Sequence, residues 1–214
     1  MVLYRHGPSS GAYRPAVPSI SLFLDISQGA GLAGSSGIRP YLPPLLAGAL
    51  ARGDVGLDFS GTSYSFLESP WWLALMLALA VVSYLLERRR PRFAMSRPAE
   101  LVLGALGIAF GALLFAGSLA DTGHRSWPGL IAGAACAALG FAAVVGLLRR
   151  TRRRLDGSAA SFLSAYADLA ALALAGLSIL LPPVAYLGLV AFALLLASEQ
   201  RAGGRKYEGL RILR

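Results

Sequence analysis

The sequence predicts an all-α fold, a polytopic bundle of about six transmembrane helical segments whose first and last regions are broken by glycine or proline. Three observations lead to this expectation. The 214-residue chain is 56% hydrophobic and only 14% charged, against about 45–50% and about 25% in soluble domains. Four uninterrupted apolar runs are each close to the length that crosses a bilayer, about 20 residues. Basic residues collect in the loops between those runs.

These segments leave no room for a separate soluble domain. The uninterrupted runs are apolar on every face, whereas a helix in a soluble core alternates apolar and polar faces. Two further apolar stretches contain glycine or proline, or are short. The four runs cover 70–87, 98–120, 127–148 and 158–181, and the irregular stretches cover 18–50 and 184–198. We therefore expect a flexible tail at 1–17, one transmembrane domain at 18–198 and a basic tail at 199–214.

The first irregular stretch contains glycines in the order of a dinucleotide-binding turn. Gly29, Gly31 and Gly34 satisfy the pattern G-x-G-x-x-G, but a phosphate cradle requires a preceding strand and an α/β unit. The surrounding residues predict neither. Small residues four apart, such as Ala33 and Gly37, instead let helices approach closely within a bilayer. We expect a first helix that is surrounded by other helices.

A polar stripe follows this first helix. Asp25, Gln28, Ser35 and Arg39 are three, seven and four residues apart, so they lie along one helical face. Charged side chains inside a membrane normally face a cavity or a partner. The stripe ends at RPYLPP, where three prolines remove backbone donors and are expected to bend or unwind the segment. The predicted hinge or break residues are Gly37, Pro40, Pro43 and Pro44, with Pro182 and Pro183 in the late region.

Asp168 is the candidate partner for this stripe. It is ten residues from Ser158, which places it about 15 Å along a helix and near the middle of the membrane. We expect a polar pocket between the first and fifth segments. The alternative is that Asp25 lies among lipid headgroups while Asp168 pairs with Arg39 to fix the packing of the helices. The predicted pocket comprises Asp25, Gln28, Ser35, Ser36, Arg39 and Asp168.

The net charge of +9 is concentrated in arginine-rich loops and in the C-terminal tail. The positive-inside rule places these segments in the cytoplasm, and the loops with Asp54 and Asp121 then face outward. The stretch 158–198 must cross the membrane and return, because its roughly 40 residues would otherwise form one helix about 60 Å long. That length is about twice the thickness of the hydrocarbon core. We therefore expect a hairpin at Pro182 and Pro183. The prediction is a multi-pass protein of a bacterial plasma membrane with both the N-terminus and the C-terminus cytoplasmic.

Basic clusters beside a membrane helix also attract anionic lipids, by about 1 kcal/mol per residue. Membrane lipids with anionic headgroups are therefore expected partners, although orientation alone also accounts for the charge. No aromatic or fold signature of nucleic-acid binding accompanies the basic residues. The expected headgroup contacts are Arg88, Arg89, Arg90, Arg152, Arg153 and Arg154.

Patterns typical of catalysis or metal binding are not found in the sequence. There is no Ser/His/Asp set and no HExxH motif, and His6 and His124 lack the neighbouring ligands that a metal site requires. Cys136 lies among small apolar residues and is interpreted as a small buried hydrophobe. We expect no cofactor and no metal, and we favour a non-enzymatic role.

Three stretches, GLAGSSGIRPYLPPLLAGALAR, SPWWLALMLALAVVSYLLE and FLSAYADLAALALAGLSILLPPVAYLGLVAFALLL, resemble an uncharacterised membrane family called domain of unknown function 4126. The resemblance spans about residues 20–198, and the compact arginine run after Glu87 and the extra prolines depart from the family pattern. It implies no particular activity. The residues that match the family's G-L-R-x-F-L-P-like motif are Gly37, Ile38, Arg39, Tyr41, Leu42 and Pro43 or Pro44, and its later features match Asp168 and Pro182.

The sequence favours a carrier or binder of a small solute or lipid, in which the intramembrane charges bind or relay charge and the prolines act as hinges. The alternative is a structural or assembly factor. Such a factor would use the same charges and the small-residue faces to pack against itself, as a homo-oligomer, or against another membrane protein. A membrane enzyme is the third interpretation.

Overall fold

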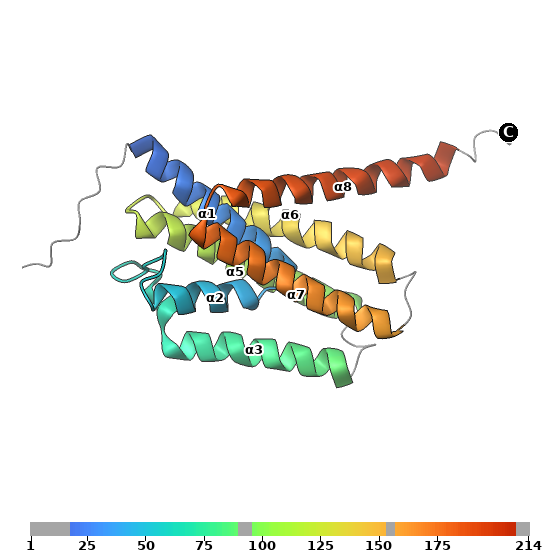
Figure 1. Ribbon diagram of the computed structural model, residues 1–214, viewed down its shortest axis with the longest axis horizontal. Coiled ribbons are helices and arrows are strands. Elements are labelled where there is room, and N and C mark those ends of the chain that lie inside the picture. The colour runs from blue at the N-terminus through green and yellow to red at the C-terminus, as the bar shows by residue number, and fades with distance from the viewer. Residues whose placement is uncertain (1–17, 90–95, 153–156, 209–214) are drawn as a thin grey trace, which may run out of the picture.

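The computed structural model describes residues 18–89, 96–152 and 157–208, and within these ranges the chain is all-α. Seven α-helices of the described chain run roughly along one common axis (Figure 1). A short 3-10 helix, η1, precedes the third of them. The elements are α1 (Pro18–Ile38), α2 (Leu42–Ala51), η1 (Ser65–Glu68), α3 (Pro70–Arg89), α5 (Arg97–Asp121), α6 (Trp127–Arg152), α7 (Gly157–Leu180) and α8 (Val184–Glu208).

Three of these helices are long and apolar enough to cross a membrane, namely α3, α5 and α6 over Trp127–Leu148. Shorter apolar helical segments occur at Leu42–Ala51, Ser164–Leu180 and Val184–Ser198. The predicted all-α class is confirmed for the described chain. Large apolar side chains also point outward, with Trp71 67% and Leu187 70% exposed. Such a surface suits hydrocarbon, because lipid tails are as apolar as these side chains.

The stretch 18–50, which the sequence left open between a bend and a re-entrant turn, forms two helices. The chain leaves the helical conformation at Arg39, since a following proline disfavours the α conformation of the residue before it. Pro43 and Pro44 then lie in the first turn of α2, where their missing N–H groups cost nothing. α2 turns back toward the end of the bundle at which α1 starts (Figure 1). α1 is about 31 Å long and α2 about 15 Å.

The helices define two ends of the bundle. The loop end contains the connections 52–64 and 122–126, and the arginine end contains the C-terminus of α3 and the N-terminus of α5. The described chain starts at the loop end, with α1, and finishes at the arginine end, with α8 (Figure 1). The prolines after Ile38 reverse the chain, so the two helices of the stretch 18–50 run in opposite directions. The two termini, which the sequence predicts to share one side, lie outside the described residues.

α1 is the central helix and contacts α2, α5, α6, α7 and α8. Residues 27–37 are all buried, as expected for a helix surrounded by others. A side chain at Gly37 would collide with the backbone of α6 at Ala137 and Phe141, so glycine permits this close approach. The G-x-G-x-x-G pattern lies inside the uninterrupted helix. Its backbone N–H groups are therefore used by the helix and do not form a phosphate cradle.

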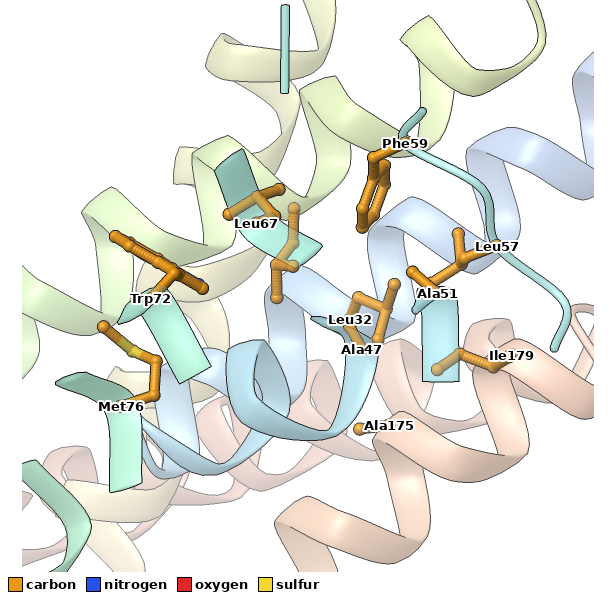
Figure 2. Packing of buried hydrophobic residues seen from close by; sticks show 11 residues of the cluster. Leu32, Ala47, Ala51, Leu57, Phe59, Leu67, Trp72, Met76, Ala175 and Ile179 are labelled. Atoms are coloured by element: carbon orange, nitrogen blue, oxygen red, sulfur yellow. The ribbon is translucent and has the colours of Figure 1, made fainter. Parts of the chain in front are cut away.

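The connection between α2 and α3 folds back into the bundle and fills the space beside the short α2. Phe59 and Leu67 from this connection point between the surrounding helices (Figure 2). Trp72 contacts Phe66 and Phe110 edge to face, with ring centroids 5.2 and 5.7 Å apart. The buried cluster consists of Leu32, Ala47, Ala51, Leu57, Phe59, Leu67, Trp72, Met76, Leu114, Ala175 and Ile179. It fixes the loop-end half of α3 against α2.

The late helices form the hairpin expected from their length. α7 ends at Leu180 and α8 starts at Val184, and Pro182 and Pro183 lie in the turn between them. The backbone N–H of Val184 donates to the carbonyl oxygen of Leu181 at 3.0 Å. The turn therefore reverses the chain at the loop end (Figure 1).

Substitution of Gly37 tests the close packing of α1 on α6. We expect Gly37→Ala to lower the free energy of unfolding by about 1–3 kcal/mol, because the added methyl group overpacks a backbone contact. Gly176→Ala is the matched control, since a Cβ there meets only a side-chain carbon of Leu46 at an ordinary 3.9 Å. Thermal unfolding of both variants in detergent measures the difference. Equal stability of the two variants would contradict the packing.

Candidate functional site

The centre of the candidate site is Arg39, which follows the last residue of α1. Its side chain is only 11% exposed. The guanidinium Nη1 donates to Oε1 of Glu87 at 2.8 Å, and Nε forms an ion pair with Oδ1 of Asp168. Nη2 donates to the hydroxyl and, at 3.4 Å, to the carbonyl oxygen of Ser164. One guanidinium therefore joins the end of α1 to α3 and α7.

Ser164 closes this network. Its hydroxyl donates to Oε2 of Glu87 at 2.6 Å while it accepts from Arg39. Ser164 and Asp168 are four residues apart on α7, so they lie on one face of that helix. We call Arg39, Glu87, Ser164 and Asp168 the arginine cluster. Asp168 is 11 residues from the start of α7 and 12 from its end, which places the cluster about 16 Å from the start of that helix.

The two carboxylates of the arginine cluster are less buried than the guanidinium. The Glu87 side chain is 32% and the Asp168 side chain 40% exposed. Burying charges is favourable only when good geometry and hydrogen bonds replace the lost hydration. Arg39 meets that condition at Nη1 and Nη2, which donate to Glu87 and Ser164, whereas Nε contacts Asp168 as an ion pair without a hydrogen bond. The arrangement uses the forked geometry of arginine, which lysine cannot reproduce.

A pocket of about 260 Å³ lies against the arginine cluster. Its position follows from the lengths of the helices, because α2 is about 15 Å long and α3 about 30 Å. α2 therefore covers α3 only over its loop-end half, where Trp72 and Met76 are buried. The pocket is lined by Tyr41, Leu42, Ala80, Val81, Tyr84, Glu87 and Asp168. It thus lies between α3, α7 and the break that follows α1.

Asp25 and Gln28 lie away from this pocket. Asp25 is 14 residues before Arg39, hence about 21 Å along α1, and its carboxyl group lies near Thr122 and His124 at the loop end. The side-chain amide of Gln28 donates to the carbonyl oxygen of Gly56 at 2.9 Å. Both residues share a helical face with Arg39 but occupy a different depth. The structure therefore joins Arg39 to Asp168 and leaves Asp25 and Gln28 with the connections at the loop end.

Ser35 and Ser36 are fully buried inside α1. Each hydroxyl donates to the carbonyl oxygen of Leu32, at 2.9 Å. Such bonds to the preceding turn satisfy a serine hydroxyl in an apolar interior. Neither residue lines the pocket beside the arginine cluster.

Further acidic groups gather at the loop end. Asp121 accepts a hydrogen bond from the backbone N–H of Asp58 at 3.3 Å, and Glu68 accepts one from the backbone N–H of Phe59. Hydrogen bonds from Ser60 lower the pKa of the exposed Asp58 carboxyl. Within the described ranges, no three His, Cys, Asp or Glu side chains are placed to hold a metal ion. These carboxylates therefore hold the connection 52–64 against the end of α5.

The predicted headgroup contacts are described only in part. Arg88 and Arg89 end α3 and are exposed, and Arg88 donates to the hydroxyl of Tyr84 at 3.3 Å. Arg152 is the last residue of α6, but its side chain lies outside the described part of the chain. Arg90, Arg153 and Arg154 also lie outside the described residues. Contact with lipid stays a prediction for this set.

Sequence reasoning missed Glu87, Ser164 and the role of Tyr41 at the pocket. Glu87 ends an apolar run and precedes three arginines, so it was interpreted as the boundary of a segment. The spacing of Ser164 and Asp168 was a signal that could have been used, because residues four apart share a helical face. Glu87 carried no such periodic signal.

A family model described as Domain of unknown function (DUF4126) matches residues 26–200. The chain belongs to this family. The match confirms the resemblance found in the sequence. No curated protein and no solved structure matches the chain.

In this DUF4126 protein, two motifs that carried the resemblance meet at the arginine cluster. The first motif supplies Arg39 and the pocket residues Tyr41 and Leu42, and the later one supplies Asp168. They are more than 120 residues apart in the chain. The fold thus brings the distinctive residues of both motifs to one place beside a pocket.

Removal of the guanidinium tests the arginine cluster. We expect Arg39→Gln to destabilise the protein by about 1–3 kcal/mol, because it leaves two partly exposed carboxylates without their cation. The variant Arg39→Gln/Glu87→Gln/Asp168→Asn is expected to recover part of that loss, since it removes the charges together. Unfolding temperatures in detergent compare the two variants. A triple variant no more stable than Arg39→Gln alone would contradict the ion-pair account.

Proposed function

We propose that this DUF4126 protein is an integral membrane protein that binds a small solute or a lipid in the pocket beside the arginine cluster and acts as its carrier. The pocket of about 260 Å³ is the observation on which the proposal rests. Its polar wall is formed by Glu87, in the last turn of the apolar helix α3, and by Asp168, within the apolar segment Ser164–Leu180 of α7. Ionisable side chains are costly within a membrane and commonly mark the paths of substrates or ions.

The break between α1 and α2 supports the same proposal. Arg39, Pro40 and Tyr41 are not helical, and irregular backbone at membrane depth is tolerated where it is enclosed by protein or lines a cavity. In many transporters such breaks form the binding site. In this protein the break contains Tyr41, which lines the pocket, and Arg39, which forms an ion pair with the pocket residue Asp168. Pro40 is proposed to act as the hinge between the two helices.

We further propose an orientation with the arginine end in the cytoplasm of a bacterial cell and the loop end outside. The positive-inside rule supports it through Arg88, Arg89 and the other basic residues that follow α3 and α6. In this orientation α1 enters from the outer side, α2 returns to it, and α8 carries the basic tail into the cytoplasm. Anionic lipid headgroups are proposed partners of the basic residues.

A structural or assembly role is the second candidate. It is favoured by one observation, namely that the recorded contacts of the Arg39 guanidinium are all with groups of the same chain. An arginine cluster of this kind can fix how α1, α3 and α7 pack, without any ligand. In that case the apolar outer faces would contact a second copy or another membrane protein.

Native mass spectrometry of the purified protein tests the carrier proposal. We expect a small molecule or lipid to remain bound to the wild type and to be lost from Ala80→Phe, because the added ring occupies the pocket. Leu77→Phe is the matched control on the same helix, since Leu77 is 54% exposed and does not line the pocket.

Retention of the same molecule by Ala80→Phe would place its binding elsewhere and contradict the proposed site. A wild type that carries no molecule but retains a second copy or another protein would favour the assembly role.

Cysteine labelling tests the orientation. In a Cys136→Ala background, we expect a membrane-impermeant maleimide added outside intact cells to label Asp54→Cys and Ser10→Cys, whereas Arg89→Cys reacts only after the membrane is opened. Asp54 and Arg89 are exposed and lie at opposite ends of α3 and its preceding connection. Labelling of position 89 from outside would overturn the orientation. Labelling of position 10 only after opening would contradict the outward start of α1.

A further inference from the structure

We infer that the pocket beside the arginine cluster takes a ligand that carries an ammonium group. The inference rests on the proposed function, because it names the chemical class of the molecule bound at the same site. It depends on which charged groups line the pocket and on how far each of them is exposed. The ligand could be a lipid with an amino headgroup or a small free amine, and both present the same chemistry.

The cation of the site is not offered to a ligand. Arg39 does not line the pocket, and its side chain is 11% exposed. Its guanidinium nitrogens contact Glu87, Ser164 and Asp168. A phosphate or carboxylate entering the pocket would have to displace these contacts to reach the guanidinium. The fold therefore does not prepare this pocket for an anion.

The groups that do line the pocket are acceptors. Glu87 and Asp168 contribute partly exposed carboxylates, and Tyr41 and Tyr84 contribute phenol rings. Charge-assisted hydrogen bonds between an ammonium and a carboxylate are about twice as strong as neutral ones. An ammonium is also attracted to the face of a tyrosine ring. An anionic group would instead meet a cluster in which two carboxylates surround one guanidinium, so that its net charge is −1.

The size of the pocket limits the ligand to a small polar group. A volume of about 260 Å³ is slightly below the usual range of about 300–1,000 Å³ for small-molecule sites. The outer rim consists of Val81 and Tyr84, which are 49% and 58% exposed. An ammonium head therefore fits inside, while any longer apolar body extends past this rim along the surface of α3.

Two probes distinguish the sources of the ammonium. The first is native mass spectrometry of protein ejected from nanodiscs that contain equal amounts of phosphatidylethanolamine and phosphatidylglycerol. The second is thermal unfolding in detergent with n-butylammonium chloride, with n-butanol at the same concentration as the uncharged control. Retention of phosphatidylethanolamine alone identifies a lipid headgroup, and stabilisation by butylammonium alone identifies a free amine. Either result supports the inference.

The variants change groups that line the pocket, and their thermal unfolding is measured beside binding because Glu87 also bonds to Arg39 and Ser164. Tyr84→Leu removes a ring at the rim, whose hydroxyl accepts a hydrogen bond from Arg88 within the same helix. Tyr166→Leu on α7 is the matched control, because Tyr166 is 69% exposed and lies outside the pocket. We expect Glu87→Gln to weaken binding about tenfold, the change expected for one charge-assisted hydrogen bond. Tyr84→Leu is expected to weaken it less, and Tyr166→Leu not at all.

The outcomes separate this inference from the proposed function. A bound molecule without an amino group that is lost from Ala80→Phe would overturn the ammonium assignment and leave the carrier proposal intact. A preference for phosphatidylethanolamine that survives both Glu87→Gln and Tyr84→Leu would also overturn it. A wild type that binds no molecule and responds to neither probe would overturn both.

Discussion

A guanidinium placed among apolar helices must keep its hydrogen-bond partners, and the rest of this bundle is arranged around that requirement. Arg39 obtains its partners from α3 and α7, which are distant in the chain. It can do so only because the helix stops directly before it, so that the side chain leaves the end of α1 toward both neighbours. Pro40 provides that stop. The contacts of this one cation therefore help to hold the arginine-end half of α3 in place.

The small residues of α1 serve the same arrangement from the opposite face. Close contact at Gly37 seats α1 against α6 and leaves its other side for α2 and α7. With larger residues the central helix would stand farther from α6, and the reach of Arg39 to its acceptors would change. Packing and electrostatics in this protein are therefore coupled through a single helix. A change in the packing of α1 on α6, or in the contacts of Arg39, is therefore expected to alter the pocket.

The apolar runs could be predicted because length and composition alone determine whether a helix can cross a bilayer. The path at 39–44 could not, since prolines permit either a bend or a full reversal and only the packing of α2 decides between them. Periodicity correctly placed Asp25 and Arg39 on one face of α1. Residues on one face can still lie at different depths along the helix, so periodicity alone does not show that they contact the same neighbours. The pairing of Arg39 with Asp168 was foreseen because both are charged residues within apolar segments. Glu87 was not, because a carboxylate beside an arginine run is typical of a segment end.

The short α2 has a mechanical consequence for α3. Buried contacts hold α3 near Trp72 and Met76, whereas Glu87 lies 11 residues beyond Met76, or about 16 Å along the axis. Over that length, a tilt of α3 by about 10° around Met76 would move Glu87 by about 3 Å. A displacement of this size exceeds what a hydrogen bond tolerates. A tilt of this size is therefore incompatible with the contact between Glu87 and Arg39, and it would also move Val81 and Tyr84 at the wall of the pocket.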